Sequence, residues 1–586
     1  MILNQTFKKA RNLLTKTWFF AFATLSVFLF FSSCVEGANK DSNVTAEFKV
    51  RALWVDPPGF ANRAAVDTMI EKCQRAGINT ILANIMLREN VYFKSTNFIG
   101  NVNANDDFDP LAYVIEKAHA VDIKVQAWSC AYYAKPKNPD WVNKPFMSKD
   151  YDHMFLSPGH PEVNPYLISV LKELLDYDID GIHLDYTRYW NAAFDYSDAA
   201  CNRFNESYGF NPQDFVDNSE KIVAPEIENY PIRVFCPNTI AERVWEMGIM
   251  ERTMNYTELG YGYISEDTKK IDDLKAPGII IVSHYTQIST EIIGAFERYI
   301  NRGGDIVWIN PAGGAFETYP QLGTIAGIKG TENFKDGHDT INSVKDSEFG
   351  KLFSSVQINT GSNNLVLGDA RVVATSSNGN PSVTINQKDK GHFTTIGFHL
   401  MSSEKLPIIQ LLKDIILWHK AEAGITGADL LAEKRKQWID WRATHTLELA
   451  TEVKKMVEAK SPELEFTSAA GVEPHELKAI YRSGGQWLKD GICDYLYPMN
   501  YSDNMEDFKE IIDNQLSLTP SDKADRVFPG LQLYTKTDNG FGPIDAEIVK
   551  QQLELVKESG YQGFCLFAYS YLSDEIIEVV SAYDNK

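Results

Sequence analysis

The sequence predicts an α/β fold in which a (β/α)8 barrel is interrupted after its fourth strand by an inserted α/β domain. Four short apolar runs alternate with amphipathic segments between Val50 and Tyr186, and four more lie between Leu464 and Ala568. The segment 224–424 between them has a strand and helix pattern of its own. Apolar strands that alternate with helices are typical of a parallel sheet covered on both faces, and eight such strands close a barrel.

The first half of the barrel is expected in residues 49–223. Its first strand, Val50–Val55, ends at Asp56-Pro57-Pro58-Gly59, and such a cluster of turn residues predicts a loop. The expected strands cover residues 50–55, 78–86, 123–130 and 181–186, and the expected helices cover 64–76, 111–120 and 161–175.

The second half is expected in residues 425–586. A long helix at 438–459 opens it, and another helix is expected at 547–559. The four expected strands cover residues 464–469, 493–499, 527–533 and 563–568.

The segment 224–424 contributes none of the eight expected barrel strands. Its expected helices cover 240–253 and 290–301, and its expected strands cover 233–235, 278–282, 305–309, 365–375, 383–386 and 392–397. A long insertion in a loop adds little closure entropy, so a barrel tolerates it. Loops at the C-terminal face of a barrel also carry function.

Residues 1–34 have the features of a targeting segment. Lys8, Lys9, Arg11 and Lys16 precede an apolar run at 18–31, which is shorter than the ~20 residues of a comfortable membrane span. The run ends at Phe31-Ser32-Ser33-Cys34, which resembles a bacterial lipobox, so we expect lipidation at Cys34, a tether over 35–48 and a place in the cell envelope, at the outer membrane or cell surface. An ordinary signal peptide or an anchor helix is the alternative.

Composition excludes some partners. The net charge of −22 makes nucleic acid an unexpected partner, because an acidic surface repels phosphate. None of the cysteines forms a CxxC pair, which favours buried free thiols, and we expect neither a metal site nor a cofactor.

Several strings resemble the glycosyl hydrolase-like family 10 group of bacterial lipoproteins. The most specific of them is Asp180-Gly181-Ile182-His183-Leu184-Asp185-Tyr186-Thr187-Arg188-Tyr189. The others, which occur in the family's order along the chain, are Arg51–Val55, Gly77–Ile81, Val125–Trp128, Trp438–Arg442 and Cys493–Tyr501. The resemblance implies a TIM barrel and an O-glycosyl hydrolase that works on an oligo- or polysaccharide. The inserted segment resembles glutamine-amidotransferase-like, flavodoxin-type domains at 278–283 and 299–308, but it has no cysteine after Cys236 to serve as their nucleophile.

Glycosidic bond cleavage usually needs two carboxyl groups, which a barrel places at the C-terminal ends of its strands. Asp185 ends the fourth strand between His183 and Arg188, where a nearby cation is expected to keep it ionised as a nucleophile or base. Its alternative is a structural aspartate. Glu473 and Asp503 follow the neighbouring fifth and sixth strands and rank first as the second carboxylate.

Asp56 and Glu89 are weaker candidates for that second carboxylate. Any of these acids could instead be a solvated loop charge. Aromatic, arginine and asparagine side chains near strand ends are the candidate sugar contacts, with packing inside the barrel as their alternative. They are Trp54, Asn84, Arg88, Trp128, His183, Tyr186, Arg188, Tyr497, Tyr501 and Tyr569.

Two other functions compete with a glycosidase. One is a non-catalytic glycan-binding lipoprotein, which is favoured if no second carboxyl lies within ~5–9.5 Å of Asp185. The other is an amidotransferase-like hydrolase in the insert, for which Ser283 with His284 is the adjacent candidate pair, although no nucleophile-elbow motif surrounds it.

Overall fold

The computed structural model describes residues 48–583 apart from 136–137, 147–153, 224–230, 238–239, 284–287, 312–313, 336–338, 359–361, 400–405, 425–428 and 538–539. The predicted targeting segment, the predicted lipidation site at Cys34 and nearly all of the predicted tether therefore lie outside the described residues. Among the helices that are described, none is both long enough and apolar enough to cross a membrane.

Eight parallel strands form the barrel sheet, in the order β19-β18-β6-β5-β2-β1-β23-β20. They are β1 (Val50–Val55), β2 (Thr80–Leu87), β5 (Lys124–Cys130), β6 (Gly181–Asp185), β18 (Glu465–Ser468), β19 (Tyr495–Leu496), β20 (Gly530–Gln532) and β23 (Gly563–Phe567). Each coincides with an expected strand, because runs that are apolar throughout belong to strands buried on both faces.

The two outer strands of this order are joined to each other. Parallel bridges pair Leu496 with Val527 and Met499 with Gly530. The amide of Gly530 donates to the carbonyl of Pro498 at 2.8 Å, and that of Phe528 donates to Leu496 at 2.9 Å. The strands from the two distant halves of the sequence therefore form one closed ring.

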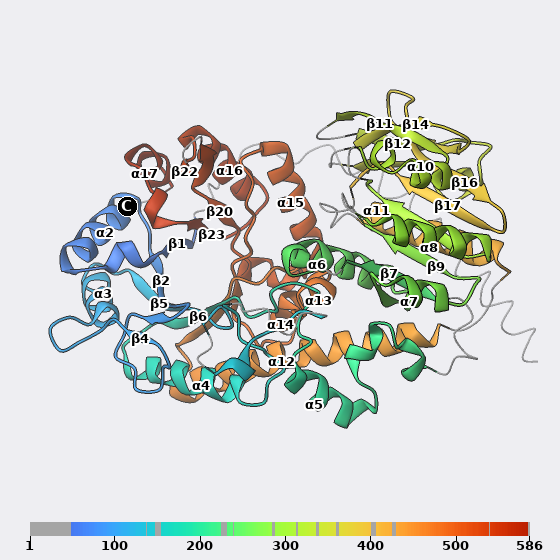
Figure 1. Ribbon diagram of the computed structural model, residues 1–586. Coiled ribbons are helices and arrows are strands. Elements are labelled where there is room, and N and C mark those ends of the chain that lie inside the picture. The colour runs from blue at the N-terminus through green and yellow to red at the C-terminus, as the bar shows by residue number, and fades with distance from the viewer. Residues whose placement is uncertain are drawn as a thin grey trace, which may run out of the picture. The chain divides into compact units, whose positions relative to one another are not determined.

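A helix follows each strand of the barrel sheet. In chain order these helices are α2 (Arg63–Arg75), α3 (Pro110–His119), α4 (Val163–Glu173), α12 (Leu430–Lys460), α14 (Gly484–Lys489), α15 (Met505–Leu518), α16 (Ala546–Glu558) and α17 (Asp574–Ser581). Between β6 and α12 the chain leaves the barrel, and Figure 1 shows the green and yellow strands that it forms there.

These strands make a second sheet of nine, in the order β13-β12-β15-β16-β17-β10-β9-β7-β8. The parallel part consists of β7 (Ile232–Cys236), β8 (Gly262–Ser265), β9 (Ile279–Val282), β10 (Asp305–Ile309) and β17 (Gly391–Ile396). The antiparallel part consists of β12 (Asp339–Ser343), β13 (Ser355–Ile358), β15 (Arg371–Thr375) and β16 (Pro381–Lys388).

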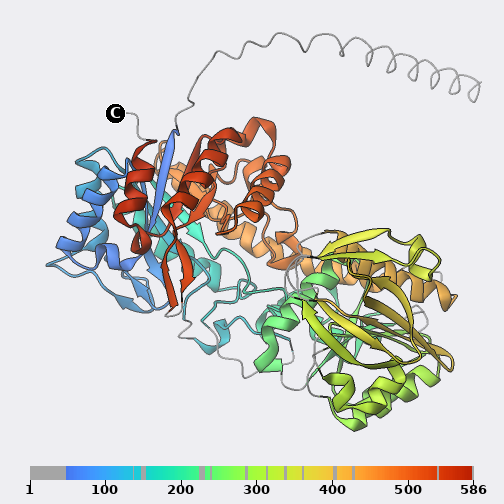
Figure 2. The ribbon, with the colours of Figure 1, turned by 90° about the horizontal axis from the view of Figure 1, so that it is seen from above.

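Helices cover both faces of the second sheet. Ile280 and Trp308 pack with α8 (Thr290–Asn301) and α10 (Pro320–Ala326) on one face. Ile281 and Val307 pack with α6 (Ile240–Thr257) and α11 (Leu406–Glu422) on the other. Figure 2 shows the same sheet from above with its helices alongside. The alternation of neighbouring residues between the two clusters follows from the period of two in a strand.

The long helix α12 belongs to two apolar clusters. Leu449 and Val453, in its second half, pack with the barrel strands. Trp438 and Trp441, in its first half, join the cluster that includes the second sheet. The helix begins at Leu430, eight residues before the expected start, and the carboxylate of Asp429 caps it by accepting from Ala432.

A buried ionic network also joins α12 to α6. Glu251 is fully buried and accepts a hydrogen bond from Tyr196 at 3.1 Å and another from Tyr263. The guanidinium groups of Arg435 and Arg442 lie 3.5 and 3.4 Å from its carboxylate. Paired in this way, the buried charges avoid the penalty of an isolated ion.

Two expected strands differ from the structure. The expected strand at 365–375 is two strands, β14 (Ser362–Leu367) and β15, because the chain turns at Gly368, whose amide donates to the carbonyl of Gly327. The expected strand at 493–499 has ladder pairing only at Tyr495–Leu496. Local hydrophobicity placed the runs correctly but could not place a turn or a bulge.

The six cysteines of the described residues are free and buried, as expected.

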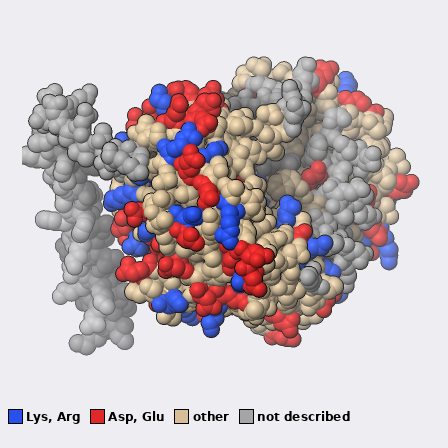
Figure 3. All heavy atoms as spheres, turned by 90° about the vertical axis from the view of Figure 1, so that its left-hand side faces the viewer, with Lys and Arg blue, Asp and Glu red and all other residues tan. Residues whose placement is uncertain are grey.

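Figure 3 shows acidic and basic side chains interspersed over one face of the molecule.

Candidate functional site

The strand β6 places a carboxylate at the C-terminal end of the barrel. Asp185 is its last residue and is only 6% exposed. Its Oδ1 accepts a hydrogen bond of 2.6 Å from the amide of Tyr186, the next residue, whose φ of 50° lies in the left-handed region. Left-handed conformations in residues other than glycine cost energy and concentrate at functional sites.

Burial dominates the ionisation of Asp185. It raises the pKa of this carboxyl, against the opposing effects of the Tyr186 amide and of the guanidinium groups of Arg188 and Arg482. From the sequence, a nearby cation was expected to keep Asp185 ionised. The cation is present, but desolvation outweighs it, and a carboxyl with a raised pKa is suited to donate a proton.

Arg482 links Asp185 to two glutamates from the segment that follows β18. It donates to Glu476 twice, from Nε to Oε2 at 2.9 Å and from Nη2 to Oε1 at 2.6 Å. Asp185 and Glu473 are both close enough to raise the pKa of its guanidinium, although burial opposes them. Asp185, Glu473 and Glu476 therefore surround one buried arginine.

Gly471 makes room for the two glutamates. A Cβ atom at this position would lie 2.2 Å from Oε2 of Glu473 and 3.0 Å from Oε1 of Glu476. The amide of Gly471 also donates to Oε1 of Glu476 at 3.3 Å. A larger residue at position 471 would therefore displace the ends of these two side chains.

One side of the site is a stack of aromatic rings and arginines. The rings of Tyr133 and Tyr186 stack with centroids 4.7 Å apart. Arg188 lies over Tyr186 at 4.9 Å and Arg88 lies over Tyr133 at 5.3 Å. Cation–π contacts of this kind hold arginines in place beside the acid.

Another aromatic series leads from the site to the surface. Tyr501 is near enough to Asp185 for the two to interact electrostatically, and it stacks on Phe567 at 5.3 Å. Tyr534 follows at 6.3 Å from Tyr501, and Phe541 follows at 5.5 Å from Tyr534. Tyr534 and Phe541 lie in the hairpin of β21 (Tyr534–Thr537) and β22 (Gly540–Pro543), and Phe541 is 64% exposed.

Several buried polar atoms of the site lack a hydrogen-bond partner among the described residues. They are Asn84 Oδ1, Trp128 Nε1, Tyr501 OH and Arg482 Nη1. The indole N–H of Trp128 lies close enough to Asp185 to lower the pKa of this carboxyl, although the two groups fall short of a well-aligned hydrogen bond. Buried polar groups are nearly always satisfied, so a group of them around one carboxyl is what a site for a hydroxyl-rich ligand requires.

Three predicted contact residues pack inside the barrel instead. His183 is fully buried, its Nε2 accepts from the indole N–H of Trp54 at 3.2 Å, and its Nδ1 lies 2.9 Å from Thr467 Oγ1. Burial lowers its pKa to about 3, so the ring is neutral. Tyr497 packs on both rings, 6.2 Å from Trp54 and 5.4 Å from His183. These side chains fill the barrel rather than line its mouth.

The remaining candidates have no recorded interaction with Asp185. Asp503 is exposed and accepts from Thr535 at 2.9 Å. Tyr569 lies against Gly59 and 5.7 Å from the ammonium group of Lys72 in α2. Asp56 is bound to Ser570 through the serine amide at 3.1 Å. The last strand-end acid, Glu89, lies near Tyr92. Burial raises the pKa of Tyr92, and the charge of Glu89 raises it further.

Of the competing candidate pair in the insert, Ser283 and His284, the structure describes only the serine. Ser283 follows β9, while His284 lies outside the described residues. At the barrel mouth, the described residues contain no group of three His, Cys, Asp or Glu ligands that would suit a metal ion.

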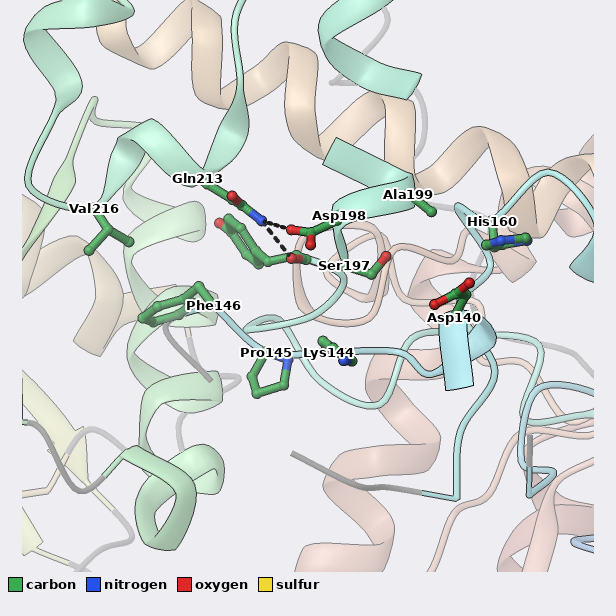
Figure 4. Close-up of a pocket in the computed structure, with 11 residues that line it drawn as sticks. Asp140, Lys144, Pro145, Phe146, His160, Ser197, Asp198, Ala199, Gln213 and Val216 are labelled. Carbon is green, nitrogen blue, oxygen red and sulfur yellow. Dashed lines mark hydrogen bonds between the residues drawn. The ribbon is translucent and has the colours of Figure 1, made fainter. Parts of the chain in front are cut away.

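A pocket of about 710 Å³ opens among the loops that follow β5 and β6. Figure 4 shows Asp140 and His160 on one side of it and Gln213, bound to Asp198 at 2.9 Å, on the other. No sequence-predicted site residue lines it. The pocket is therefore separate from the group around Asp185.

Sequence reasoning missed Arg482, Glu476, Tyr133 and Tyr534. Tyr133 stands three residues beyond β5, so the rule of aromatic residues after strands could have found it. Arg482 lies in a loop, Glu476 begins the short helix α13 (Glu476–Ala479) and Tyr534 lies in a hairpin. None of them belongs to a motif, and only the fold brings them to Asp185.

The first half of the barrel is the part of the chain that matches a known protein family. Residues 49–218 match the family model Glycosyl hydrolase-like 10. Glycosyl hydrolase YngK of Bacillus subtilis (strain 168) is 22% identical over 178 residues, which are 25% of this chain and 34% of that protein. Glycosyl hydrolase DigH of Escherichia coli (strain K12) is 25% identical over 169 residues, 23% of this chain and 37% of that protein. The match thus spans about a third of each relative's length.

Two solved structures are similar over more of the chain. The β-galactosidase from Bacillus circulans sp. alkalophilus has 12% identity and a TM-score of 0.27, covering 65% of this chain and 89% of that one. The cold-adapted β-galactosidase from Rahnella sp. R3 has 10% identity and a TM-score of 0.27, covering 66% and 90%.

Proposed function

We propose that this protein is an O-glycosyl hydrolase that cleaves an oligo- or polysaccharide at the mouth of its barrel. The observation that carries the proposal is the buried carboxyl of Asp185 at a strand end, joined through Arg482 to Glu473 and Glu476 and surrounded by unpartnered polar atoms. The match of residues 49–218 to a glycosyl hydrolase-like family supports it.

The two carboxyl groups take different roles. Burial raises the pKa of Asp185, so Asp185 is the proton donor to the leaving oxygen. Glu473 lies near the Arg482 guanidinium, in the loop after the strand that neighbours β6. We assign the role of base or nucleophile to Glu473 because of this position. Glu476 accepts two hydrogen bonds from Arg482 and thereby holds its guanidinium near Asp185 and Glu473.

The substrate fits the aromatic series at the mouth. Tyr501, Tyr534 and Phe541 run from beside Asp185 to the exposed hairpin. Tyrosine and phenylalanine faces offer apolar area to sugar rings, while the phenol oxygen and Asn84 offer hydrogen bonds to hydroxyls. An extended glycan with several rings matches this series better than a single sugar.

A released-sugar screen tests the function. The mature protein and Asp185→Asn are incubated with a panel of glycans, and the products are analysed by mass spectrometry and by NMR of the anomeric proton. Products from the wild type alone support hydrolysis, and the first-formed anomer tells whether the pair retains or inverts configuration. Glycan binding without products from either protein would favour a non-catalytic glycan-binding protein instead.

We further propose that Cys34 anchors the protein to the cell envelope, at the outer membrane or cell surface. The basic residues before the apolar run and the sequence Phe31-Ser32-Ser33-Cys34 support this location. Intact-mass analysis of protein from membranes tests it, since Cys34→Ala should release the protein into the soluble fraction.

The segment 224–424 is proposed to be an inserted flavodoxin-type domain. Its parallel strands lie in the spatial order β8-β7-β9-β10-β17, which is the order 2-1-3-4-5 of flavodoxin-like sheets. A glutamine-amidotransferase-like origin is compatible with this order, and the lack of a cysteine between Cys236 and Cys493 argues against amidotransferase chemistry there.

A further inference from the structure

Three side chains of metal-ligating type converge at one end of the second sheet. Asp305 is the first residue of β10, His392 is the second residue of β17, and His419 lies in the last turn of α11. One ligand atom from each side chain can be chosen so that all three atoms lie within 4.8 Å of one another. Such a separation allows a single small ion to reach all three side chains.

The two histidines contact different oxygens of Asp305. Nδ1 of His392 lies 3.1 Å from Oδ1, which also accepts from the His392 amide at 2.8 Å. Nδ1 of His419 lies 3.2 Å from Oδ2. The carboxylate therefore stands between two imidazole nitrogens.

His419 is the informative member of the group. Its side chain is fully buried, and its Nε2 is 3.0 Å from the hydroxyl of Thr394. This contact fixes the ring so that Nδ1 faces Asp305. Nδ1 nevertheless lacks the alignment of a hydrogen bond with any partner among the described residues. A ring held by its other nitrogen is how proteins orient a histidine that binds a metal.

We propose that Asp305, His392 and His419 bind a divalent transition-metal ion of the zinc class. Two imidazoles and one carboxylate are a donor set that zinc accepts, with water in the fourth position, whereas calcium and magnesium take oxygen ligands. His392 is 19% exposed, so solvent can reach the ion and supply that water.

The ion would act as a structural tie. Its ligands come from two strands and from α11, and such an ion stabilises the folded state because the unfolded chain lacks the preformed site. The site belongs to the second sheet and not to the barrel mouth, so it is independent of the proposed hydrolase function.

Metal content tests the proposal directly. Full-length protein without a histidine tag is stripped with a chelator, titrated with Zn²⁺, Ca²⁺ or Mg²⁺ by calorimetry, and analysed for bound metal after dialysis. We expect one zinc per chain and a higher Tm with zinc. His392→Ala, at the exposed rim, and Asp305→Asn, which keeps the side-chain shape, should each weaken zinc binding by at least about tenfold.

The matched control is His119→Ala. His119 also contacts a carboxylate, with Nε2 2.9 Å from Oδ2 of Asp180, but it lies on the barrel and outside the cluster. This variant should bind zinc as the wild type does. Absence of zinc from the wild type, equal affinity in His392→Ala and Asp305→Asn, or equally tight binding of calcium would each overturn the proposal.

Discussion

Arg482 binds Glu476 through two parallel hydrogen bonds and at the same time interacts electrostatically with Asp185, which lies on a different strand of the barrel. The arginine comes from the segment after β18, whereas Asp185 ends β6. These two strands are neighbours in the sheet, with Ser468 paired to Leu184. The contact between sequence-distant segments creates the charged centre of the site.

Asp185→Asn should abolish proton donation. We expect turnover of the natural glycan to fall by ~10²–10⁴-fold, the usual contribution of a general acid. Aryl glycosides with a good leaving group need little protonation, so the same variant should retain more activity on them. Steady-state kinetics on both substrates measures the difference, and equal losses on both would contradict the assigned role.

The stability of Asp185→Asn has an expected sign. The folded pKa of Asp185 lies above its unfolded value, so the folded state binds the proton more tightly and stability falls as pH rises through this interval. At neutral pH the variant should be at least as stable as the wild type in a urea titration. Asp178→Asn, at a side chain that is 94% exposed, is the matched control and should change neither activity nor stability.

Glu473→Gln should reduce turnover of natural and activated substrates alike, because the base or nucleophile is needed whatever the leaving group. A loss of ~10²-fold or more is expected. Glu476→Gln should act more mildly, through the position of Arg482. If Glu473→Gln retains wild-type kcat while Asp503→Asn does not, the second carboxylate has been misassigned.

The pH profile should report the charge around Asp185. As a proton donor it is active when protonated, so kcat/KM should fall as pH rises through its raised pKa. Arg188 lowers that pKa, and Arg188→Gln should therefore move the basic limb of the profile to higher pH. Arg75→Gln removes the same charge from an exposed ion pair with Asp574 and should leave the limb in place.

Phe541→Ala tests the aromatic series. Its ring is exposed, so the substitution should not change folding, while the loss of one stacking contact of roughly 0.5–1.5 kcal/mol should raise KM for long glycans by up to about tenfold. Short substrates that do not reach the hairpin should be unaffected. Trp245→Ala, an equally exposed aromatic on α6, provides the comparison. A uniform effect on all chain lengths would argue against a remote subsite.

Arg442→Met should destabilise the junction of α12 with α6. Glu251 would keep a fully buried carboxylate with one arginine fewer, and breaking a buried ion pair costs ~3–5 kcal/mol. Urea unfolding followed by circular dichroism measures the change. Lys436→Met removes an exposed pair with Asp440 on the same helix and should shift stability by less than about 1 kcal/mol. Similar effects of both substitutions would mean that the network carries little stability.

The sequence alone determined the eight barrel strands and the position of Asp185. Apolar strands buried on both faces leave a local signal, and a residue at the end of such a strand must lie at the rim of a parallel sheet. The same reasoning placed His183 on the face of Asp185, because alternate residues share a face. Sequence periodicity could not show that His183 lies deeper in the barrel than Asp185.

Tertiary structure decided the rest. Inward-facing side chains of a barrel stack in layers, so His183, Trp54 and Tyr497 fill the interior while Asp185 lies in the layer at the mouth. Arg482 and Glu476 belong to no sequence motif, because what brings them to Asp185 is the neighbouring position of β18 and β6. The cluster of Asp305, His392 and His419 likewise has no sequence motif, because its residues come from two strands and a helix that only the fold brings together. Strand positions depend on neighbours in sequence, but a site depends on which distant segments the closed sheet brings together.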